Sequence, residues 1–434
     1  MKRTFATVSL AMLTAFGLAA CGGGNGGGGT TTPAGGGETT AGAGGETTGG
    51  EGGEGGLAEA ELTMLAASYS DNTTTLWQEV IDAFEADNPG VTIELEIQSW
   101  ENINDVIRTK VQSNQAPDIL SIDAFSGYVE DELLYSADEI LSEETIADFQ
   151  DGFIQNATMD GKQYGFPLIA SARALFVNDA ILEEAGASVP TTWDELHEAA
   201  QLIVDNTDAY GYGMPLGNEE AQAELGIWIF SGGGGYGSDS EITVDSAENL
   251  AAVEFMKKMI DDGLTQPNAG ATQRTPMQDA FIQGEYGMVV GLPPMMGWIE
   301  ERNPDLEYSI VDIPTVDGSQ ATLGVADHLM AFKNDGDKGA QIGAFLDFFY
   351  QADNYVKFVD TEGFLPVTKS GAEGTTLDQF APFTELLPFA QFYPSTNPAW
   401  SATQAEIQSQ IGTISTGANP ADVLAGIQSV ADNS

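Results

Sequence analysis

Four stretches near the start of the body of the chain decide the fold: ELTML at 61–65, TTTLWQEVIDAF at 73–84, VTIELEI at 91–97 and PDILSID at 117–123. The first, third and fourth are short and either apolar or alternating, which is typical of strands. The second repeats apolar residues at helical spacing, and a further amphipathic helix is predicted at 103–111. The order strand, helix, strand, helix, strand predicts βαβ units around a parallel sheet, the pattern of the α/β class.

The same pattern restarts after residue 167. Strands are predicted at 174–177 and 286–292, and helices at 178–185, 193–206, 247–262 and 275–283. Residues 57–434 are more than one hydrophobic core usually holds. Two cores are therefore predicted, and no internal repeat is found in the sequence.

The first residues have the pattern of an export signal. Lys2 and Arg3 precede an apolar run, which ends in LAAC at Cys21, the sole cysteine of the chain. This run is shorter than the ~18 apolar residues that a membrane span needs, so residues 1–20 are predicted to be a signal peptide. LAAC resembles the bacterial lipobox, which implies lipidation of Cys21 and an extracytoplasmic, membrane-anchored protein. An ordinary signal peptide with an incidental cysteine is the alternative.

Residues 21–56 follow the signal and are dominated by Gly, Thr and Glu. Such a composition cannot bury enough apolar surface to offset the entropy of ordering the chain. This segment is therefore predicted to be a flexible tether between the lipidated cysteine and the body.

The charge of the chain is extreme. It carries 66 acidic and 14 basic residues, with a formal net charge of −52. Nucleic acids and anionic lipid surfaces are recognised by clustered Lys and Arg, so both are excluded as partners. A carboxylate-rich surface stays hydrated while salt screens its self-repulsion. We therefore hypothesise an acidic protein suited to high salt, from a halophilic source.

Several short motifs follow one another along the body. They are FEADNPGV at 84–91, APDIL at 116–120, DGKQYGFP at 160–167, ALFVN at 174–178, PTTWDEL at 190–196, DAFIQGEYGM at 279–288, GFLPV at 363–367 and ANPADVL at 418–424. In order and spacing they resemble the family 1 extracellular solute-binding proteins of ABC importers, the sugar-binding lipoprotein class that includes maltose-binding protein. The resemblance covers about residues 60–430.

This resemblance implies a type II periplasmic-binding-protein fold, in which two α/β lobes enclose a ligand cleft. Lobe one would comprise 57–168 plus 315–365, and lobe two 169–314 plus 366–434. It further implies a monomer that captures a neutral sugar or oligosaccharide by lobe closure and delivers it to the permease subunits of an importer. No cofactor is implied.

A sugar offers apolar C–H faces to aromatic rings and hydroxyls to planar polar groups. Aromatic ligand-binding candidates are therefore sought outside apolar helix faces, and they are Trp100, Trp228, Trp298, Phe364 and Trp400. The resemblance implies that Trp400 stacks on a sugar ring. At Trp298 this chain has a Pro-Pro pair where many relatives have Gly-Pro, and Phe364 could instead pack a hinge. Trp77 and Trp193 lie on helix faces and are assigned to packing.

Polar ligand-binding candidates lie at strand ends and at a predicted crossing between lobes. They are Ser68, Tyr69, Asp71, Asp123, Arg173, Asp327 and His328. Asp123 could instead cap a helix, Arg173 could form a structural ion pair, and His328 could be a loop histidine without ligand contact.

Catalytic signatures are missing from the sequence. The two histidines, His197 and His328, lack metal-binding spacing, and neither His-Glu-x-x-His nor Gly-x-Ser-x-Gly occurs. We therefore expect no enzyme, no metal and no cofactor. Two alternatives stay open: a binder of another solute, such as a polyol or polyamine, and a surface glycosidase or adhesion lipoprotein.

Overall fold

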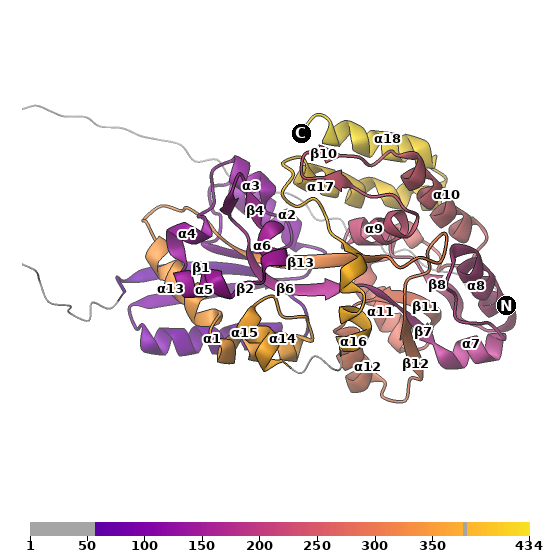
Figure 1. The fold of residues 1–434 in the computed structure, drawn as a ribbon, viewed down its shortest axis with the longest axis horizontal. Coiled ribbons are helices and arrows are strands. Elements are labelled where there is room, and N and C mark those ends of the chain that lie inside the picture. The colour runs from indigo at the N-terminus through magenta and orange to yellow at the C-terminus, as the bar shows by residue number, and fades with distance from the viewer. Residues whose placement is uncertain (1–56, 376–379) are drawn as a thin grey trace, which may run out of the picture. The chain divides into compact units, whose positions relative to one another are not determined.

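The computed structural model describes residues 57–375 and 380–434. The predicted signal peptide, Cys21 and the tether lie outside the described residues. Within the described part, two separate sheets carry helices on their faces (Figure 1). Among the helices of that part, none combines the length and the apolar character that crossing a bilayer requires.

The first sheet has the strand order β14-β13-β3-β1-β2, with β6 also paired to β13. Strand β1 runs parallel to both β2 and β3, as the βαβ pattern predicts. Strand β13 instead runs antiparallel to β3 and to β6, so the sheet is mixed. The strands are β1 (Ala60–Ala67), β2 (Val91–Gln98), β3 (Ile119–Ile122), β6 (Phe166–Ala172), β13 (Thr322–Ala331) and β14 (Ala390–Gln391).

The second sheet has the order β12-β7-β11-β8. Strand β11 is parallel to β8, whereas both β11 and β12 are antiparallel to β7. These strands are β7 (Ala174–Asn178), β8 (Tyr210–Gly213), β11 (Tyr286–Gly291) and β12 (Tyr308–Val311), and two small hairpins pair β4 (Thr158–Met159) with β5 (Lys162–Gln163) and β9 (Gly237–Ser238) with β10 (Glu241–Ile242).

The helices that accompany the first sheet include both that were predicted before residue 123. They are α1 (Thr73–Asp87), α2 (Ile103–Gln112), α3 (Ser126–Glu130), α4 (Ala137–Ile140), α5 (Glu143–Asp148), α6 (Asp151–Gln155), α13 (Gly339–Phe349), α14 (Ala352–Glu362) and α15 (Lys369–Gly374). On α1, the buried face comprises the apolar residues that the spacing predicts, together with Thr73.

The remaining helices accompany the second sheet and the end of the chain. They are α7 (Asp179–Ala185), α8 (Trp193–Asn206), α9 (Ala221–Ser231), α10 (Ala247–Asp261), α11 (Arg274–Ile282), α12 (Met295–Arg302), α16 (Ala381–Thr384), α17 (Trp400–Gln410), α18 (Pro420–Ala431), and the short 3-10 helices η1 (Ala269–Ala271), η3 (Leu387–Phe389) and η4 (Ile411–Thr416). Helix α8 begins and ends where the sequence predicts, with Thr192 capping its first turn.

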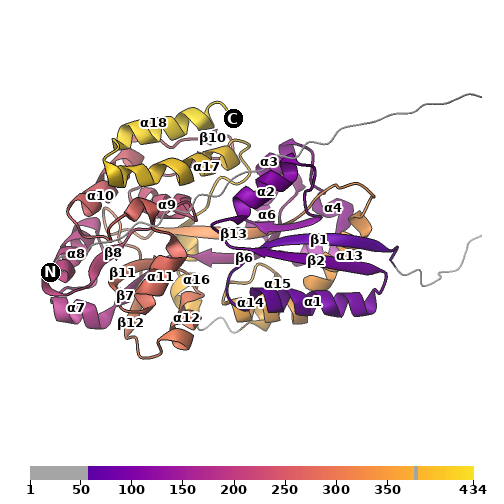
Figure 2. The ribbon, with the colours of Figure 1, turned by 180° about the vertical axis from the view of Figure 1, so that it is seen from behind.

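In the described part of the chain, strands β6, β7 and β13 form two connections between the two sheets. Strand β6 continues through Arg173 directly into β7, so one extended segment belongs to both sheets. Strand β13 returns beside β6 in antiparallel pairing, and Figures 1 and 2 show this pair running between the two groups of elements. Leu365, between α14 and α15, forms an isolated bridge to Ala170 of β6. The lobe boundaries derived from the sequence remain a prediction.

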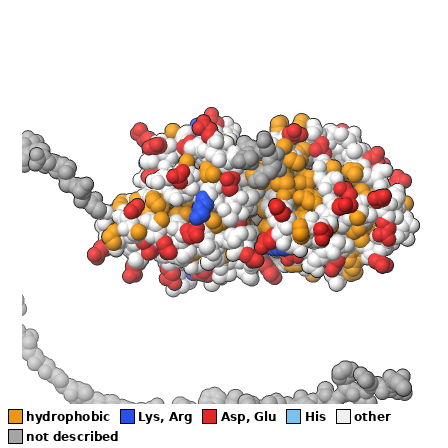
Figure 3. Space-filling view, turned by 90° about the horizontal axis from the view of Figure 1, so that it is seen from below, with side chains coloured by type: hydrophobic (Ala, Val, Ile, Leu, Met, Phe, Trp, Pro, Cys, Tyr) orange, Lys and Arg blue, Asp and Glu red, His pale blue; other side chains and the backbone are white. Residues whose placement is uncertain are grey.

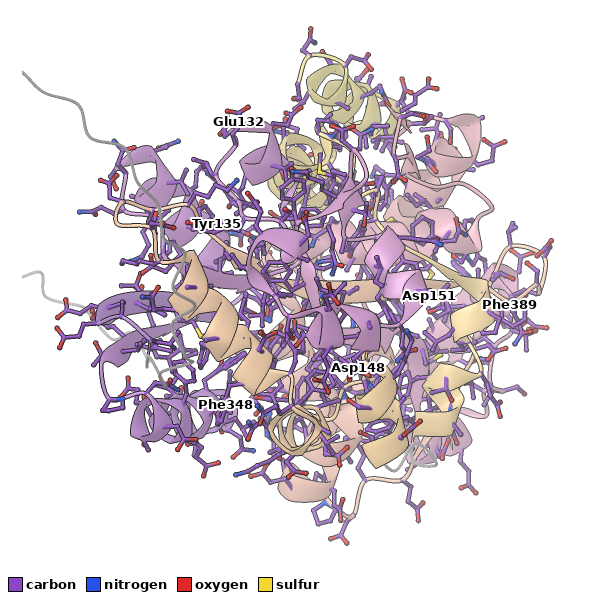
Figure 4. All side chains as sticks on the ribbon, turned by 60° about the vertical axis from the view of Figure 1, so that its left-hand side comes forward. Glu132, Tyr135, Asp148, Asp151, Phe348 and Phe389 are labelled. Carbon is purple, nitrogen blue, oxygen red and sulfur yellow. The ribbon has the colours of Figure 1, made fainter. Side chains whose placement is uncertain are left out.

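Side-chain contacts fix the chain that follows Leu365. Asp148 of α5 accepts hydrogen bonds from the backbone N and the Oγ of Ser370, at 3.0 and 2.5 Å. Lys369 lies 3.7 Å from Asp151 of α6. Figure 4 labels both aspartates on neighbouring helices, so α5 and α6 together hold the start of α15.

Thr73, at the start of α1, fixes the loop between β1 and α1. Its Oγ1 accepts hydrogen bonds from the backbone N of Tyr69 and of Ser70, both at 2.9 Å, and donates to Glu362 Oε1 at 2.7 Å. Thr73 is fully buried. Burial also raises the pKa of Glu362. One hydroxyl therefore satisfies three groups that are costly to leave unpaired in a buried setting.

Replacing Thr73 with valine should lower the free energy of unfolding by about 1–3 kcal/mol, because two backbone N–H groups and one carboxyl lose a partner while the side-chain shape is kept. Urea denaturation measures this loss. Thr75→Val, at an exposed position of the same helix, should change stability by less than about 0.5 kcal/mol. Equal effects of the two substitutions would contradict the role assigned to Thr73.

Candidate functional site

A cavity of about 380 Å³ lies where the loops after β1, β2 and β3 meet the crossing segments and helices α11, α12 and α17. It is the size expected of a small-molecule site. Loops at the carboxyl ends of β1, β2 and β3 supply one group of its wall residues, in keeping with the usual position of ligands in open α/β sheets. The crossings supply Ser171, Arg173, Val325 and Asp327.

Most of the predicted ligand-binding side chains line this cavity. They are Ser68, Tyr69, Asp71, Trp100, Asp123, Arg173, Trp298, Asp327 and Phe364. These residues come from sequence positions as far apart as 68 and 364, and the fold brings them into one space. Ligand contact by these side chains is a proposal.

Three predicted side chains do not line the cavity. Trp228 packs against Trp193 and Phe255, and its Nε1 donates to Glu224 at 2.8 Å. Trp400, which is fully buried, stacks on Tyr393 with ring centroids 5.2 Å apart.

His328, the third, is buried beside Phe125, and its Nδ1 lies 3.3 Å from the carbonyl oxygen of Asp123. Burial lowers the pKa of His328 to about 4, so it is neutral at physiological pH. Its contacts are with the protein, as are those of Trp228 and Trp400.

Two buried carboxyls stand in the cavity wall. Gln404 Nε2 donates to Asp123 Oδ2 at 3.0 Å, and Tyr69 Oη donates to Asp327 Oδ2 at 2.9 Å. Burial raises the pKa of Asp123 to about 6, with the charge of Glu220 adding to the shift. Burial and the charge of Asp123 raise the pKa of Asp327 to about 7. At neutral pH the two carboxyls therefore carry less than their full charge.

Arg173, Glu220 and Arg274 form a buried ionic cluster in the same wall. Arg173 Nη2 donates to Glu220 Oε1 at 2.8 Å, and its Nη1 donates to Ser171 Oγ at 3.1 Å. Arg274 pairs with the other oxygen of Glu220. Burial lowers the pKa of Arg173. A cluster of this kind holds its guanidinium planes in fixed positions and aims the remaining N–H groups.

The aromatic part of the wall is built around Tyr69. Its ring packs edge-on against Phe364 at a centroid distance of 5.0 Å and lies 5.9 Å from Trp100. Trp298 is half-buried, and the guanidinium of Arg302 lies 5.9 Å from its ring centroid. The cavity thus combines ring faces with fixed planar polar groups.

Several polar atoms of the wall are buried without a hydrogen-bond partner in the described part of the chain. Apart from Glu220 Oε2, which is in an ion pair with Arg274, they are Asp123 Oδ1, Gln404 Oε1, Arg173 Nε, Arg274 Nε, Arg274 Nη1 and Gln278 Nε2. Buried polar groups that lack a partner are rare in folded proteins because each costs free energy. Because these atoms gather in one cavity, its wall offers free hydrogen-bond donors and acceptors.

Sequence reasoning missed several of these wall residues: Glu219, Glu220, Arg274, Gln278 and Gln404. Arg274 carried a usable signal, since the scarcity of basic residues that singled out Arg173 applies to it equally. The others lie in or near helices α9, α11 and α17, where nothing in a single sequence separates a cavity-facing polar residue from a solvent-facing one.

A second cavity of about 370 Å³ adjoins the first, and the two share Asn104 and Gln404 in their walls. Helices α2, α3 and α17 enclose it, with Arg108, Tyr128 and Gln408 among its lining residues. Within residues 57–375 and 380–434, no cluster of three or more His, Cys, Asp or Glu side chains could hold a metal ion.

The outer surface shows the charge imbalance of the sequence. On the face drawn in Figure 3, acidic side chains are scattered over the described part and basic ones are few. The cavity differs from this surface because Arg173, Arg274 and Arg302 lie among its lining carboxyls.

Comparison with known proteins places the chain in a family. The family model of the bacterial extracellular solute-binding proteins matches residues 67–356. A Brucella abortus (strain 2308) protein, named only as a binding protein, is 33% identical over 356 residues, covering 78% of this chain and 84% of the relative. The diacetylchitobiose binding protein DasA of Streptomyces coelicolor is 27% identical over 278 residues, 58% of this chain and 63% of the relative.

Solved structures support the fold. An ABC transporter solute-binding protein of Thermotoga lettingae, bound with α-D-tagatose, matches with a TM-score of 0.76 at 23% identity, over 86% of this chain and 99% of that one. The maltose-bound MalE3 of T. maritima matches with a TM-score of 0.74 at 17% identity, over 86% and 99%. The predicted α/β two-lobe fold with a ligand cleft between the lobes is thereby confirmed. The chain belongs to the bacterial extracellular solute-binding protein family.

Proposed function

We propose that this protein captures a neutral sugar or oligosaccharide in the described cavity by closure of two lobes and delivers it to the permease subunits of an ABC importer. One observation carries the proposal: a cavity that combines aromatic rings with buried, unpartnered planar polar groups. Aromatic rings suit the C–H faces of a sugar, and planar amides, carboxyls and guanidiniums suit its hydroxyls.

The size of the site supports more than one sugar ring. The main cavity and its neighbour have volumes of about 380 and 370 Å³ and share two wall residues. Relatives point to the same class of ligand. DasA is named for diacetylchitobiose, and a relative from Halalkalibacterium halodurans is named as an arabinooligosaccharide-binding protein.

Lobe closure is proposed as the means of capture. The lobes would be residues 57–168 plus 315–365 and residues 169–314 plus 366–434, moving about the segments that connect them. A ligand that contacts groups from both lobes, such as Asp123 and Arg274, stabilises the closed arrangement because it gains contacts only there. The closed form would then be the one that docks on the importer.

Anchoring through Cys21 is proposed from the sequence LAAC at 18–21. Lipidation of this cysteine would hold the protein at the outer side of the membrane, with residues 22–56 as a tether. A monomer suits this arrangement, and neither a cofactor nor a catalytic residue is part of the proposal.

A thermal-shift screen tests the ligand class. Neutral mono- and oligosaccharides, polyols and spermidine are compared at matched concentration. A true ligand should add about 2.7 kcal/mol of stability at a hundredfold excess over Kd. Stabilisation by spermidine or a polyol but by no saccharide would contradict a sugar ligand. Because two buried carboxyls would also suit a glycosidase, turnover of the stabilising sugar is followed as well, and none is expected.

The raised pKa values of Asp123 and Asp327 predict opposite pH effects on ligand affinity and on stability. As pH falls from 8 to 5, both carboxyls become protonated and lose charge-assisted acceptor strength, so sugar affinity should drop about tenfold. The ligand-free protein should gain stability over the same range. A folded-state pKa above the unfolded value near 4 means that the folded protein binds the proton more tightly, and this contribution is lost as pH rises through 6 and 7.

Asp327→Asn isolates this effect in calorimetry and chemical denaturation. This substitution should reduce the difference in free energy of unfolding between pH 5 and pH 8 by on the order of 2 kcal/mol. Asp208→Asn, at an exposed position, is the matched control and should keep the native pH profile. Identical profiles for the native protein and Asp327→Asn would rule out the buried carboxyl as the cause.

Cys21→Ser tests the anchor. In cells that process lipoproteins, the native protein should fractionate with membranes and incorporate labelled fatty acid, whereas the Cys21→Ser protein should do neither. Membrane fractionation of the variant together with unchanged ligand binding would show that attachment does not depend on this cysteine.

A further inference from the structure

The unpartnered polar atoms of the cavity are not a random mixture of donors and acceptors. On Arg173, Arg274 and Gln278 they are all N–H groups: Arg173 Nε, Arg274 Nε, Arg274 Nη1 and Gln278 Nε2. A guanidinium has no acceptor atom and cannot be deprotonated in a protein. This part of the wall therefore requires a ligand group that accepts hydrogen bonds.

A second part of the wall has the opposite character. Asp123 Oδ1 and Gln404 Oε1 are unpartnered acceptors, and the Gln404 amide is oriented by the bond that its Nε2 donates to Asp123 Oδ2 at 3.0 Å. Asp327 lines the same cavity, and among the described residues its carboxyl accepts a side-chain hydrogen bond from Tyr69 alone. Ring hydroxyls, which donate, suit this part of the wall.

The charge of the donor wall decides what kind of acceptor it fits. Glu220 pairs with both Arg173 and Arg274. Glu219 lies beside them, accepting from the backbone N of Thr275 at 3.0 Å. Two arginines and two glutamates cancel in charge. The wall therefore presents several N–H donors with little net positive charge, which suits a neutral acceptor better than an anion.

The rest of the cavity reinforces this preference. Asp71, Glu101, Asp123 and Asp327 also line it, and no lysine does. The remaining lining arginine, Arg302, is already paired with Asp279 at 2.6 Å. A carboxylate on the ligand would therefore enter a space with a surplus of carboxyl groups, and like charges repel strongly where water is scarce.

We propose that the ligand is a neutral saccharide that carries an acetamido group. Its carbonyl oxygen accepts from Gln278 and Arg274, and its ring hydroxyls donate to Asp123 and Asp327. An amide carbonyl accepts through two lone pairs and, unlike a hydroxyl oxygen, carries no proton. Pro276 and Leu292 in the same cavity offer apolar surface to the acetamido methyl. This inference rests on the proposed function and specifies its ligand class.

Isothermal titration with three disaccharides tests the proposal. Di-N-acetylchitobiose and cellobiose share ring and linkage and differ at the acetamido position, and digalacturonate adds carboxylates. We expect di-N-acetylchitobiose to bind at least about tenfold more tightly than cellobiose, because a buried donor left without its acceptor is costly. Equal affinities, or tighter binding of digalacturonate, would overturn the proposal.

The outcomes separate this proposal from the function on which it rests. If other saccharides bind but di-N-acetylchitobiose does not, the acetamido assignment fails and sugar capture stands. If no saccharide binds at all, both fail.

Gln278→Leu tests the assigned contact, since it removes an N–H donor at similar size without touching the ionic cluster. It should erase the preference for di-N-acetylchitobiose over cellobiose, because the affinity for di-N-acetylchitobiose falls at least about tenfold more than that for cellobiose. Gln278→Glu, which replaces the donor with an acceptor, should do the same if the leucine variant fails to fold. Gln283→Leu, at an exposed position just after the same helix, should keep the preference. An equal loss of affinity for both disaccharides in the Gln278 variants would overturn the contact.

Discussion

The pairing of two crossing strands is the constraint on which the rest of the structure depends. Arg173 joins β6 to β7, its N–H donates to the carbonyl oxygen of Leu323 at 3.0 Å and to Thr322 Oγ1 at 3.2 Å, and Thr322 returns a bond to the Arg173 carbonyl. Strand β13 therefore runs beside β6 in one register from Gly324 to Asp327, beyond which a bulge shifts the pairing. The two sheets are tied to each other through this pair, and any relative motion of the lobes has to bend it.

That register also places the polar wall of the cavity. Side chains two apart on a strand share a face, so Ser171 and Arg173 point the same way, as do Val325 and Asp327. Val325 is the direct partner of Ser171 across the pair, and all four residues line the cavity. A shift by one residue would turn Arg173 and Asp327 into the core, where neither would find a partner.

The surface of the molecule is acidic, whereas the few arginines of its described part are gathered in the cavities. The arginines of the described part are Arg108, Arg173, Arg274 and Arg302, and each lines one of the two adjoining cavities. The net charge of −52 therefore reflects the carboxylates on the surface and does not describe the charge around the ligand site. The fixed donors of the cavity, held by Glu219, Glu220 and Asp279, are what a ligand meets.

The sequence by itself determined the local elements and the family. The helical spacing from Leu76 to Phe84 and the helix at 193–206 follow from neighbouring residues, and the structure has both helices where they were predicted. The ordered motifs are also local features of the sequence, and the family resemblance that they carry implied the two-lobe fold. Most of the predicted site residues also line the cavity, since strand ends and the predicted crossing are visible in sequence.

Only the tertiary structure decided which side chains meet. It made β7 and β13 antiparallel in sheets predicted to be parallel, because strand direction depends on where a crossing segment enters a sheet. It packed Trp400 against Tyr393 and Tyr236, and it brought Gln278 and Gln404 to the cavity from helices α11 and α17. Apart from the contact of Trp400 with Tyr393, these outcomes depend on residues more than a hundred positions apart, and local periodicity carries no information about such contacts.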